Sequence, residues 1–343
     1  MTRKKKDNAL KAVSIEDVAR AAGVSPATVS RVVNKLPSVK AKNRLKVLEV
    51  VKQMHYQPSI IAQRLATGKS NTVALVIPRY EGMFYSFYAL ELIRGIGTLC
   101  EVLKLDLLLH LSDANSVLGL NGVGGVIFAD IIANRNQLED AYANKIPCVV
   151  INNYVSDLDV NCIVIDNQGG AEQAVNYLIS LEHKKIGHIT GDLITQAAAQ
   201  RLEGYKQALE KHNIALRPDY IIRTDYSRGQ ARQAAEKMLK LPDPPTAIFV
   251  ASDSMALEVM AVAKELGKQI PRDISIVGFD DNPSGLYGPV SLTTVRQPLV
   301  KMAQMSVEEL HRVMNQEKPS KVRRIALPAE LIIRESCRAL SSS

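Results

Sequence analysis

The sequence predicts a small all-α head followed by a larger α/β body. Residues 14–34 read as two short helices joined at a glycine, the helix-turn-helix arrangement that places one helix in the major groove of DNA. From residue 72 onward, short β-branched runs alternate with helical stretches, which is typical of parallel sheets covered by helices. Positive charge is confined to the first fifth of the chain, so the head and body are chemically distinct.

The charge distribution indicates what the head binds. Residues 1–69 contain 15 Lys and Arg against 4 Asp and Glu, a net charge of +11, whereas the whole chain has 43 against 35. Residues 70–343 therefore carry a net charge of −3, and a cationic head of this kind is typical of proteins that bind a polyphosphate. We interpret residues 1–12, with the run Arg3–Lys6, as a disordered basic tail that adds only non-specific affinity.

Two capping patterns delimit the first two helices. Ser14 followed by Asp17 resembles a capping box, and Gly23 ends the first helix in a left-handed conformation. Ser25 caps the second helix and Pro26 occupies its first position. The apolar faces comprise Ile15, Val18, Ala19 and Ala22 in the first helix and Val29, Val32 and Val33 in the second.

The outward side of the second helix suits entry into a groove, because its residues are small, polar or basic: Ala27, Thr28, Arg31 and Lys35. The Arg31 guanidinium can fork onto a guanine edge, and the methyl groups of Ala27 and Thr28 can contact a thymine methyl. The alternative is a capped pair of surface helices with a solvated arginine.

Two more helices follow before the body. A third is predicted over 41–54, with an inner face of Val47, Val50, Val51 and Met54. A short fourth begins at Ser59 and ends near Gly68; it is too short to be stable alone and needs a second copy or DNA to order it.

The head resembles the DNA-binding headpiece and hinge of the LacI/GalR family of bacterial transcription regulators. The matching motifs are D-V-A-x-x-A-G-V-S-x-x-T-V-S-R-V-V-N at 17–34, Tyr56-x-Pro58 and Ala62-x-Arg64-Leu65. The resemblance implies that Leu65 wedges into a base step of the minor groove, and the alternative is a leucine that packs on the body. Lys40 and Ser59 depart from the family's usual Ser and Asn, and we expect altered affinity rather than lost binding. The DNA contacts expected from the motifs and the resemblance are Ser25, Pro26, Ala27, Thr28, Ser30, Arg31, Asn34, Lys40, Asn43, Tyr56, Ser59, Ala62 and Leu65.

The body is long enough to split into two lobes. Its predicted strands are 72–77, 106–111, 126–128, 148–151, 162–165, 186–190, 247–250 and 274–279. The four cysteines show no metal or redox spacing and the six histidines form no cluster, so no metal or cofactor is expected. Neither a membrane span nor a signal peptide is recognisable, and we expect a cytoplasmic protein without membrane contact.

The resemblance extends through the body, at 201–209, 252–256, 270–281 and 292–298. It implies a periplasmic-binding-protein-like body of two Rossmann-like lobes, crossed by the chain near 165–166, 296–297 and 326–328. The expected domains are a headpiece at 13–57, a hinge at 58–71 and a ligand-binding and dimerisation domain at 72–340. Within it, lobe 1 comprises about 72–165 and 297–326, and lobe 2 about 166–296 and 327–340.

A small effector is expected in the cleft between the lobes, because parallel sheets bind ligands beyond the carboxyl ends of their strands. A carboxylate and a guanidinium there can together hold vicinal hydroxyls, and a tyrosine can stack on a sugar face. The expected contacts are Arg79, Tyr80, Asn152, Arg201, Tyr226, Asp253, Asp280 and Gln297. The alternatives are helix capping for Asp253 and Asp280, a surface ion pair for Arg201, and plain loop positions for Asn152 and Tyr226.

Two departures from the family fall in lobe 1. Residues 112–125 are too short and glycine-rich for the usual helix. An aromatic patch, defined as Tyr80, Phe84, Tyr85, Phe87 and Tyr88, reshapes either the pocket rim or a dimer face.

These observations predict a homodimeric repressor that binds a double-stranded operator under the control of a sugar or sugar derivative. A dimer is favoured over a tetramer because no leucine heptads follow Arg338. Two other classes compete: a sugar-binding protein of a transport system, and a sugar kinase with an accessory DNA-binding head. The basic head opposes the first; the second lacks a phosphate-binding G-x-x-x-x-G-K-[ST] motif and a nucleophile–base set, and Gly122-Val-Gly-Gly125 is too weak a motif, so no enzymatic activity is expected.

Overall fold

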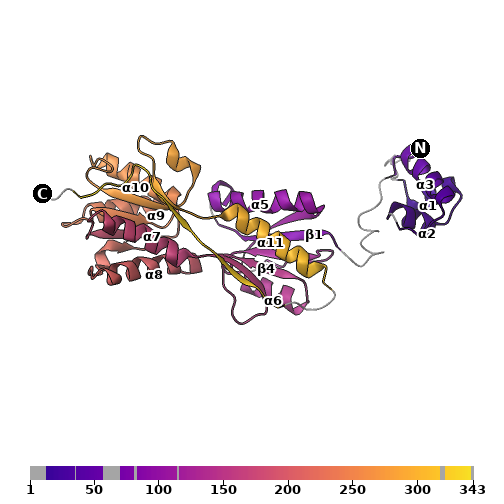
Figure 1. The fold of residues 1–343 in the computed structure, drawn as a ribbon, viewed down its shortest axis with the longest axis horizontal. Helices are drawn as coiled ribbons and strands as arrows, with labels where there is room; N and C mark the ends of the chain where they lie inside the picture. The colour runs from indigo at the N-terminus through magenta and orange to yellow at the C-terminus, as the bar shows by residue number, and fades with distance from the viewer. Residues whose placement is uncertain are drawn as a thin grey trace, which may run out of the picture. The chain divides into compact units, whose positions relative to one another are not determined.

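The computed structural model describes residues 13–34, 36–56, 70–80, 83–113, 116–316 and 321–340. The chain separates into two compact units, residues 1–70 and 71–343, which we call the head and the body (Figure 1). The predictions on the basic tail 1–12, on Lys35, on most of the hinge 58–71 and on Ser59, Ala62 and Leu65 lie outside the described residues.

The head consists of three helices, α1 (Ile15–Ala22), α2 (Pro26–Val33) and α3 (Ala41–Gln53). The predicted capping box is present: the Ser14 hydroxyl accepts from the Asp17 amide at 3.2 Å, and the Asp17 carboxylate accepts from the Ser14 amide at 3.1 Å. Gly23 is left-handed, with φ 63°, a conformation that glycine adopts without penalty. The three helices enclose one apolar core made of Val18, Ala19, Ala22, Val29, Val32 and Val47.

The body contains two six-stranded sheets. The first has the order β11-β5-β4-β3-β1-β2, and its neighbouring strands are parallel throughout. Its strands are β1 (Thr72–Pro78), β2 (Asp106–Ser112), β3 (Gly125–Ala129), β4 (Cys148–Ile151), β5 (Asn161–Ile165) and β11 (Arg324–Leu327). The second sheet has the order β12-β10-β9-β8-β6-β7, with only β12 antiparallel to its neighbour. Its strands are β6 (Ile186–Ile189), β7 (Ile221–Ile222), β8 (Ala247–Val250), β9 (Ser275–Asp280), β10 (Thr293–Arg296) and β12 (Glu330–Ile332).

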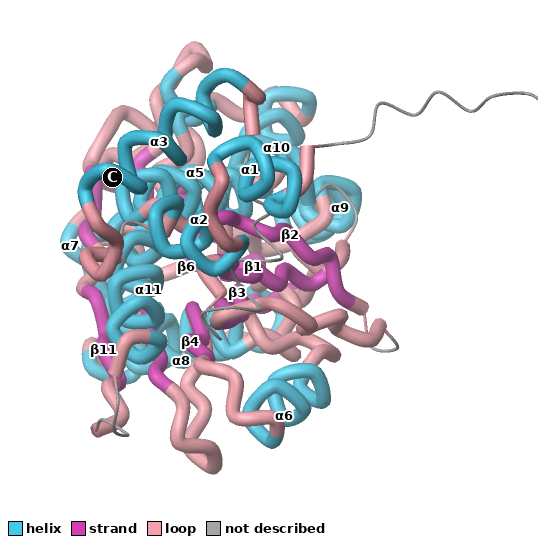
Figure 2. Tube along the Cα trace, turned by 90° about the vertical axis from the view of Figure 1, so that its right-hand side faces the viewer, coloured by secondary structure: helices cyan, strands magenta, loops and turns pink. Residues whose placement is uncertain are grey.

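Helices cover both faces of each sheet (Figures 1 and 2). In the first sheet, α5 (Phe87–Leu103) and α11 (Leu299–Met314) pack together on one face, and α6 (Arg135–Ala143) packs on the other. In the second, α7 (Asn167–Ser180) and α8 (Gln196–Lys211) lie on one face, with α9 (Arg228–Leu239) and α10 (Asp253–Glu265) opposite. The predicted α/β architecture of two lobes is confirmed.

The chain passes between the two sheets three times. It leaves the first sheet after β5, returns after β10, and leaves again after β11. The three crossings bring the carboxyl ends of β5 and β10 and the turn after β11 to the boundary between the lobes. Residues 116–124 form no helix, as the sequence predicted. Strands β7, β10, β11 and β12 were not predicted, because each has only two to four residues and no strong apolar run.

Helices α7 and α8 pack so closely that a side chain at Gly204 has no room. A Cβ at this position would lie 2.3 Å from the Gln168 carbonyl oxygen and 2.9 Å from the Ala171 Cβ. We therefore expect Gly204→Ala to destabilise the body by about 1–3 kcal/mol, because backbone must shift to admit the methyl group. Gly229→Ala is the matched control: it lies in α9 with nothing within 4 Å, and alanine favours the helix. Thermal unfolding that shows equal stability for the two variants would contradict the close packing.

Candidate DNA-binding face and effector cleft

The outward side of α2 is the candidate DNA-binding face. Val29 and Val32 are buried, whereas Ala27 and Arg31 are exposed. Arg31 forms no ion pair with any described residue, so its guanidinium is available to a ligand. Ser25 and Pro26 are exposed and Thr28, Ser30 and Asn34 are partly exposed.

Two hydroxyls of this face also form hydrogen bonds within the head. The Ser25 hydroxyl accepts from the Thr28 amide at 3.2 Å, which caps α2 as predicted, and it lies 2.9 Å from the Thr28 hydroxyl. Lys40 precedes α3 without a side-chain cap bond and is exposed, while Asn43 and Tyr56 are partly exposed. These residues remain candidates for phosphate contacts.

Two amide–carboxylate pairs line the boundary between the lobes, one from each sheet. In lobe 1, Asn152 follows β4 and its Nδ2 donates to Asp130 Oδ1 at 3.0 Å, directly after β3. In lobe 2, Gln297 follows β10 and its Nε2 donates to Asp280 Oδ1 at 2.6 Å, at the end of β9. In each pair the amide oxygen is buried without a hydrogen-bond partner. The Tyr88 hydroxyl, beside the first pair, is also buried without a hydrogen-bond partner, so two acceptors and one hydroxyl are left for a ligand to satisfy.

Arg201 is the cation of this cleft. It is only 4% exposed, its Nε donates to Asn167 Oδ1 at 2.9 Å, and its Nη1 donates to the Ala251 carbonyl at 2.6 Å. The guanidinium lies 3.7 Å from the centroid of the Phe279 ring. The alternative of a surface ion pair is therefore wrong: Arg201 is buried, fixed by neutral acceptors, and close enough to Asp130 and Asp280 to lower the pKa of both.

Burial nonetheless has the largest effect on the pKa of both carboxyls. It raises the pKa of Asp130 to about 6 and that of Asp280 to about 6, with Arg201 opposing the shift in each case. Displacing a carboxylate from water disfavours its charge, and a single guanidinium does not fully compensate two of them. Both groups stay predominantly ionised at neutral pH at a cost to stability.

Asp253 stabilises the backbone of the cleft through hydrogen bonds. Its carboxylate accepts from the Thr294 hydroxyl at 2.6 Å and from the Asn282 amide at 2.7 Å, and it is fully buried. Burial and the nearby charge of Asp280 raise its pKa to about 7. Helix capping does not explain this residue, because Ser252 caps α10. Its bonds hold the turn after β9 that presents Asp280.

Tyrosines bound the cleft. The Tyr226 ring lies directly over Gly191, where a Cβ would be 2.0 Å from the ring. The pKa of Tyr80 and that of Tyr226 are both raised, chiefly by burial and partly by the charges of Asp130 and Asp280. The two phenols therefore lie near both carboxylates, although they come from different lobes.

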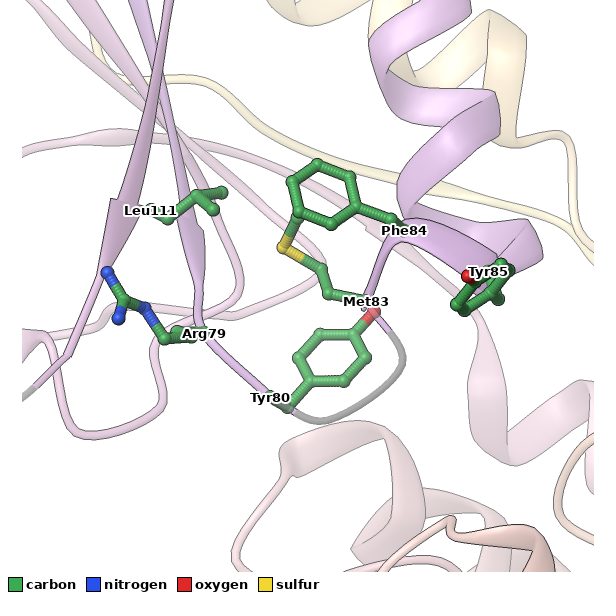
Figure 3. A pocket seen from close by; sticks show the side chains of 6 residues that line it. All are labelled: Arg79, Tyr80, Met83, Phe84, Tyr85 and Leu111. Carbon is green, nitrogen blue, oxygen red and sulfur yellow. The ribbon is translucent and has the colours of Figure 1, made fainter.

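The aromatic patch divides between two environments. Tyr88 is partly buried, with its hydroxyl enclosed beside Asp130, and its pKa is raised well above the ordinary value, first by burial and then by that carboxylate. Phe84 and Tyr85 are 60% and 91% exposed, and they border a hollow of about 320 Å³ with Arg79, Tyr80, Met83 and Leu111 (Figure 3). Arg79 thus lies on this largely apolar side, apart from the two amide–carboxylate pairs.

Five of the eleven described non-glycine residues with positive φ belong to the cleft segments. Asp130, Asn152, Tyr226, Asp280 and Asp281 have φ between 59° and 130°, which non-glycine residues rarely adopt. Such strain gathers at ligand sites, where the surrounding structure enforces it. Among the described residues there is no group of side chains arranged to hold a metal ion, and no helix is long and apolar enough to cross a membrane.

Sequence reasoning missed two residues of the cleft, Asp130 and Asn167. Each lies two residues after a predicted strand, 126–128 and 162–165, so the strand-end rule could have identified both. The contact of Asn167 with Arg201 carried no local signal, because it depends on α8 packing beside α7.

Comparisons with known proteins agree with both units. Residues 14–59 match the family described as bacterial regulatory proteins, lacI family, and 175–337 match a periplasmic binding protein-like domain. The chain is 36% identical over 315 residues to catabolite control protein A of Priestia megaterium, covering 89% of this chain and 93% of that protein. It is 34% identical over 343 residues to the HTH-type transcriptional regulator DegA of Bacillus subtilis (strain 168), covering 96% and 99%.

Solved structures give the same result. The lac repressor dimer bound to operator and the anti-inducer ONPF has a TM-score of 0.83 at 26% identity, covering 96% of this chain and 100% of that chain. The complex of the transcriptional regulator CelR with cellobiose has a TM-score of 0.72 at 26% identity, covering 94% and 99%.

The raised pKa of Asp280 gives a test of how much its charge destabilises the folded protein. A carboxyl whose folded pKa lies above its unfolded value destabilises the protein above the folded pKa and has no such effect below the unfolded one. We expect Asp280→Asn to raise the unfolding temperature by about 2–5 °C at pH 8, with only a small part of that gain left at pH 4. Asp159→Asn, on an exposed carboxyl, is the control and should change neither value. A gain of equal size at both pH values would mean that the Asp280 charge is not its cause.

Proposed function

Because the chain belongs to the lacI family of bacterial regulatory proteins, we propose that this DNA-binding transcriptional regulator is a repressor whose operator affinity is set by a polyhydroxylated effector in the body cleft. Family membership makes it a regulator rather than an enzyme. The observation that carries the effector proposal is the pair of unpartnered amide oxygens, one at the end of each sheet, each bonded to a carboxyl on which the buried Arg201 guanidinium acts. Sugar hydroxyls are donors and acceptors at once and match this arrangement.

In the head, we assign base contacts to the exposed face of α2. Arg31 is placed to read a guanine edge, and Ala27 and Thr28 to contact a thymine methyl. The family resemblance assigns a minor-groove wedge to Leu65, with Ser59 and Ala62 beside it in the hinge. Two copies are required by this scheme, because a dimer presents two heads to a pseudo-palindromic operator. The lac repressor in the similar structure is itself a dimer on its operator. Such a regulator works beside the chromosome, so the cytoplasm remains its expected location.

In the body, we assign hydroxyl recognition to Arg201, Asp280, Asp130, Asn152 and Gln297, with Tyr226 and Tyr80 as stacking surfaces. A carboxylate accepts a hydroxyl proton while the guanidinium donates to a neighbouring oxygen, so a vicinal diol satisfies both. Asp253 contributes by holding the turn that carries Asp280, and Arg79 by bordering the adjoining hollow.

Coupling between the sites follows from the position of the cleft. The effector contacts both lobes, so its affinity depends on how the lobes are closed. A direct contact already joins them: the Gln196 side-chain amide exchanges two hydrogen bonds of 2.9 Å with the backbone of Tyr154. An effector shifts the closure equilibrium only by its differential affinity for the two states, and by linkage this changes operator affinity.

The operator assignment predicts a specific loss in the head. Arg31→Ala should weaken operator binding by about tenfold to a hundredfold, as expected for one base-reading arginine. Arg20→Ala, on exposed α1, is the control and should have a smaller effect. Fluorescence anisotropy with labelled operator should also show affinity falling steeply with salt. Equal losses for the two variants would contradict the assignment of Arg31 to a base edge.

The effector assignment predicts separation of the two functions. A screen by thermal shift against sugars, sugar phosphates and nucleobases first identifies a stabilising compound. Arg201→Met should then abolish the effect of that compound on operator affinity while DNA binding survives. Arg228→Met, on a 77% exposed side chain of the same lobe, should respond like the parent chain. Undiminished binding of the compound to the Arg201 variant in calorimetry would refute the assignment.

A further inference from the structure

The charges of the cleft are unbalanced. Asp130 and Asp280 face one guanidinium, that of Arg201, whose Nε and Nη1 already bind Asn167 and Ala251. The next carboxylate, Asp281, does not add to this imbalance because it is paired with Arg296 at 2.7 Å and Arg334 at 2.5 Å. Arg79 is exposed at the hollow and forms no ion pair with Asp130 or Asp280 among the described residues. The ligand space therefore has an excess of negative charge.

The hydrogen-bonding groups of the cleft also favour a ligand that donates hydrogen bonds. Asn152 and Gln297 are 7% and 6% exposed, and each uses its NH₂ group on a carboxylate. What they leave unpartnered are two buried oxygens. Together with the carboxylate oxygens of Asp130 and Asp280, these oxygens outnumber the one unpartnered hydroxyl beside them, that of Tyr88, so the described cleft residues favour a ligand that donates hydrogen bonds.

We infer that the effector carries no anionic group, and that an amino derivative of it binds at least as tightly as the neutral compound. This inference rests on the proposed function and names the charge class of its effector. A ligand carboxylate or phosphate would lie in a low-dielectric site beside two carboxylates and two lone-pair-bearing amide oxygens, where like charges repel strongly. Hydroxyl and ammonium groups instead supply the missing donors, and an ammonium group also offsets the excess charge.

The test uses compounds that differ at one carbon atom. Glucose, its 6-amino-6-deoxy derivative and glucuronate form one series, and the three galactose counterparts form another. Calorimetry on the full chain at pH 7 should show, in whichever series binds, that the acid is at least tenfold weaker than the neutral sugar and the amine at least as tight. An acid that binds as tightly as its neutral sugar overturns the inference and leaves the proposed function intact. If no member of either series binds, both the polyol effector and the inference fail.

Variants then identify the source of the discrimination. Asp130→Asn and Asp280→Asn each remove one negative charge and keep an acceptor oxygen, so each should reduce the ratio of acid to neutral dissociation constants severalfold. Asp159→Asn is the control because it removes an exposed carboxylate of lobe 1, and it should leave that ratio unchanged. A ratio that is the same in all three variants and the parent chain would overturn the inference, since charge at the cleft would not be its cause.

Discussion

The buried guanidinium of Arg201 is the interaction on which the cleft depends. It is fixed by Asn167 from α7, by the Ala251 carbonyl after β8 and by the Phe279 ring of β9, so three elements of lobe 2 determine its position. Its charge makes the largest contribution that opposes the pKa rise of Asp280, and it acts in the same direction on Asp130, where Tyr88 and Asn152 contribute more. One guanidinium of lobe 2 therefore acts on a carboxyl of each lobe.

A cleft of this kind lowers the stability of the ligand-free protein. Two partly buried carboxylates, two unpartnered amide oxygens and several residues with positive φ are each unfavourable in isolation. A ligand that satisfies these groups recovers that free energy on binding, and it does so only when both lobes contact it. The unfavourable groups therefore make closure depend on the ligand, which is the condition for a switch rather than a permanently closed body.

The sequence predicted the elements of the fold better than the details of the cleft. The capping signals of Ser14, Ser25 and Gly23 are local, and the structure confirms them. The central strands were found because buried parallel strands are continuous apolar runs, whereas β10 was missed because Thr293, Thr294 and Arg296 are polar and depend on neighbouring strands. Asp130 obeys the same strand-end rule as Asp280 but was overlooked, and the supporting role of Asp253 depends on Thr294 and Asn282, far away in sequence.

The same topology links the cleft to the segment that leads to the head. Strands β5, β10 and β11 each precede a crossing, so any change in the angle between the lobes acts on three connections at once. Lobe 1 begins at β1, directly after the hinge segment that joins the head to the body. Rotation of lobe 1 therefore moves the point at which the chain leads to the head, and in the dimer that we propose it would move both such points together. The spacing of the two heads would then be the quantity that the proposed effector controls, because operator half-sites are separated by a fixed distance.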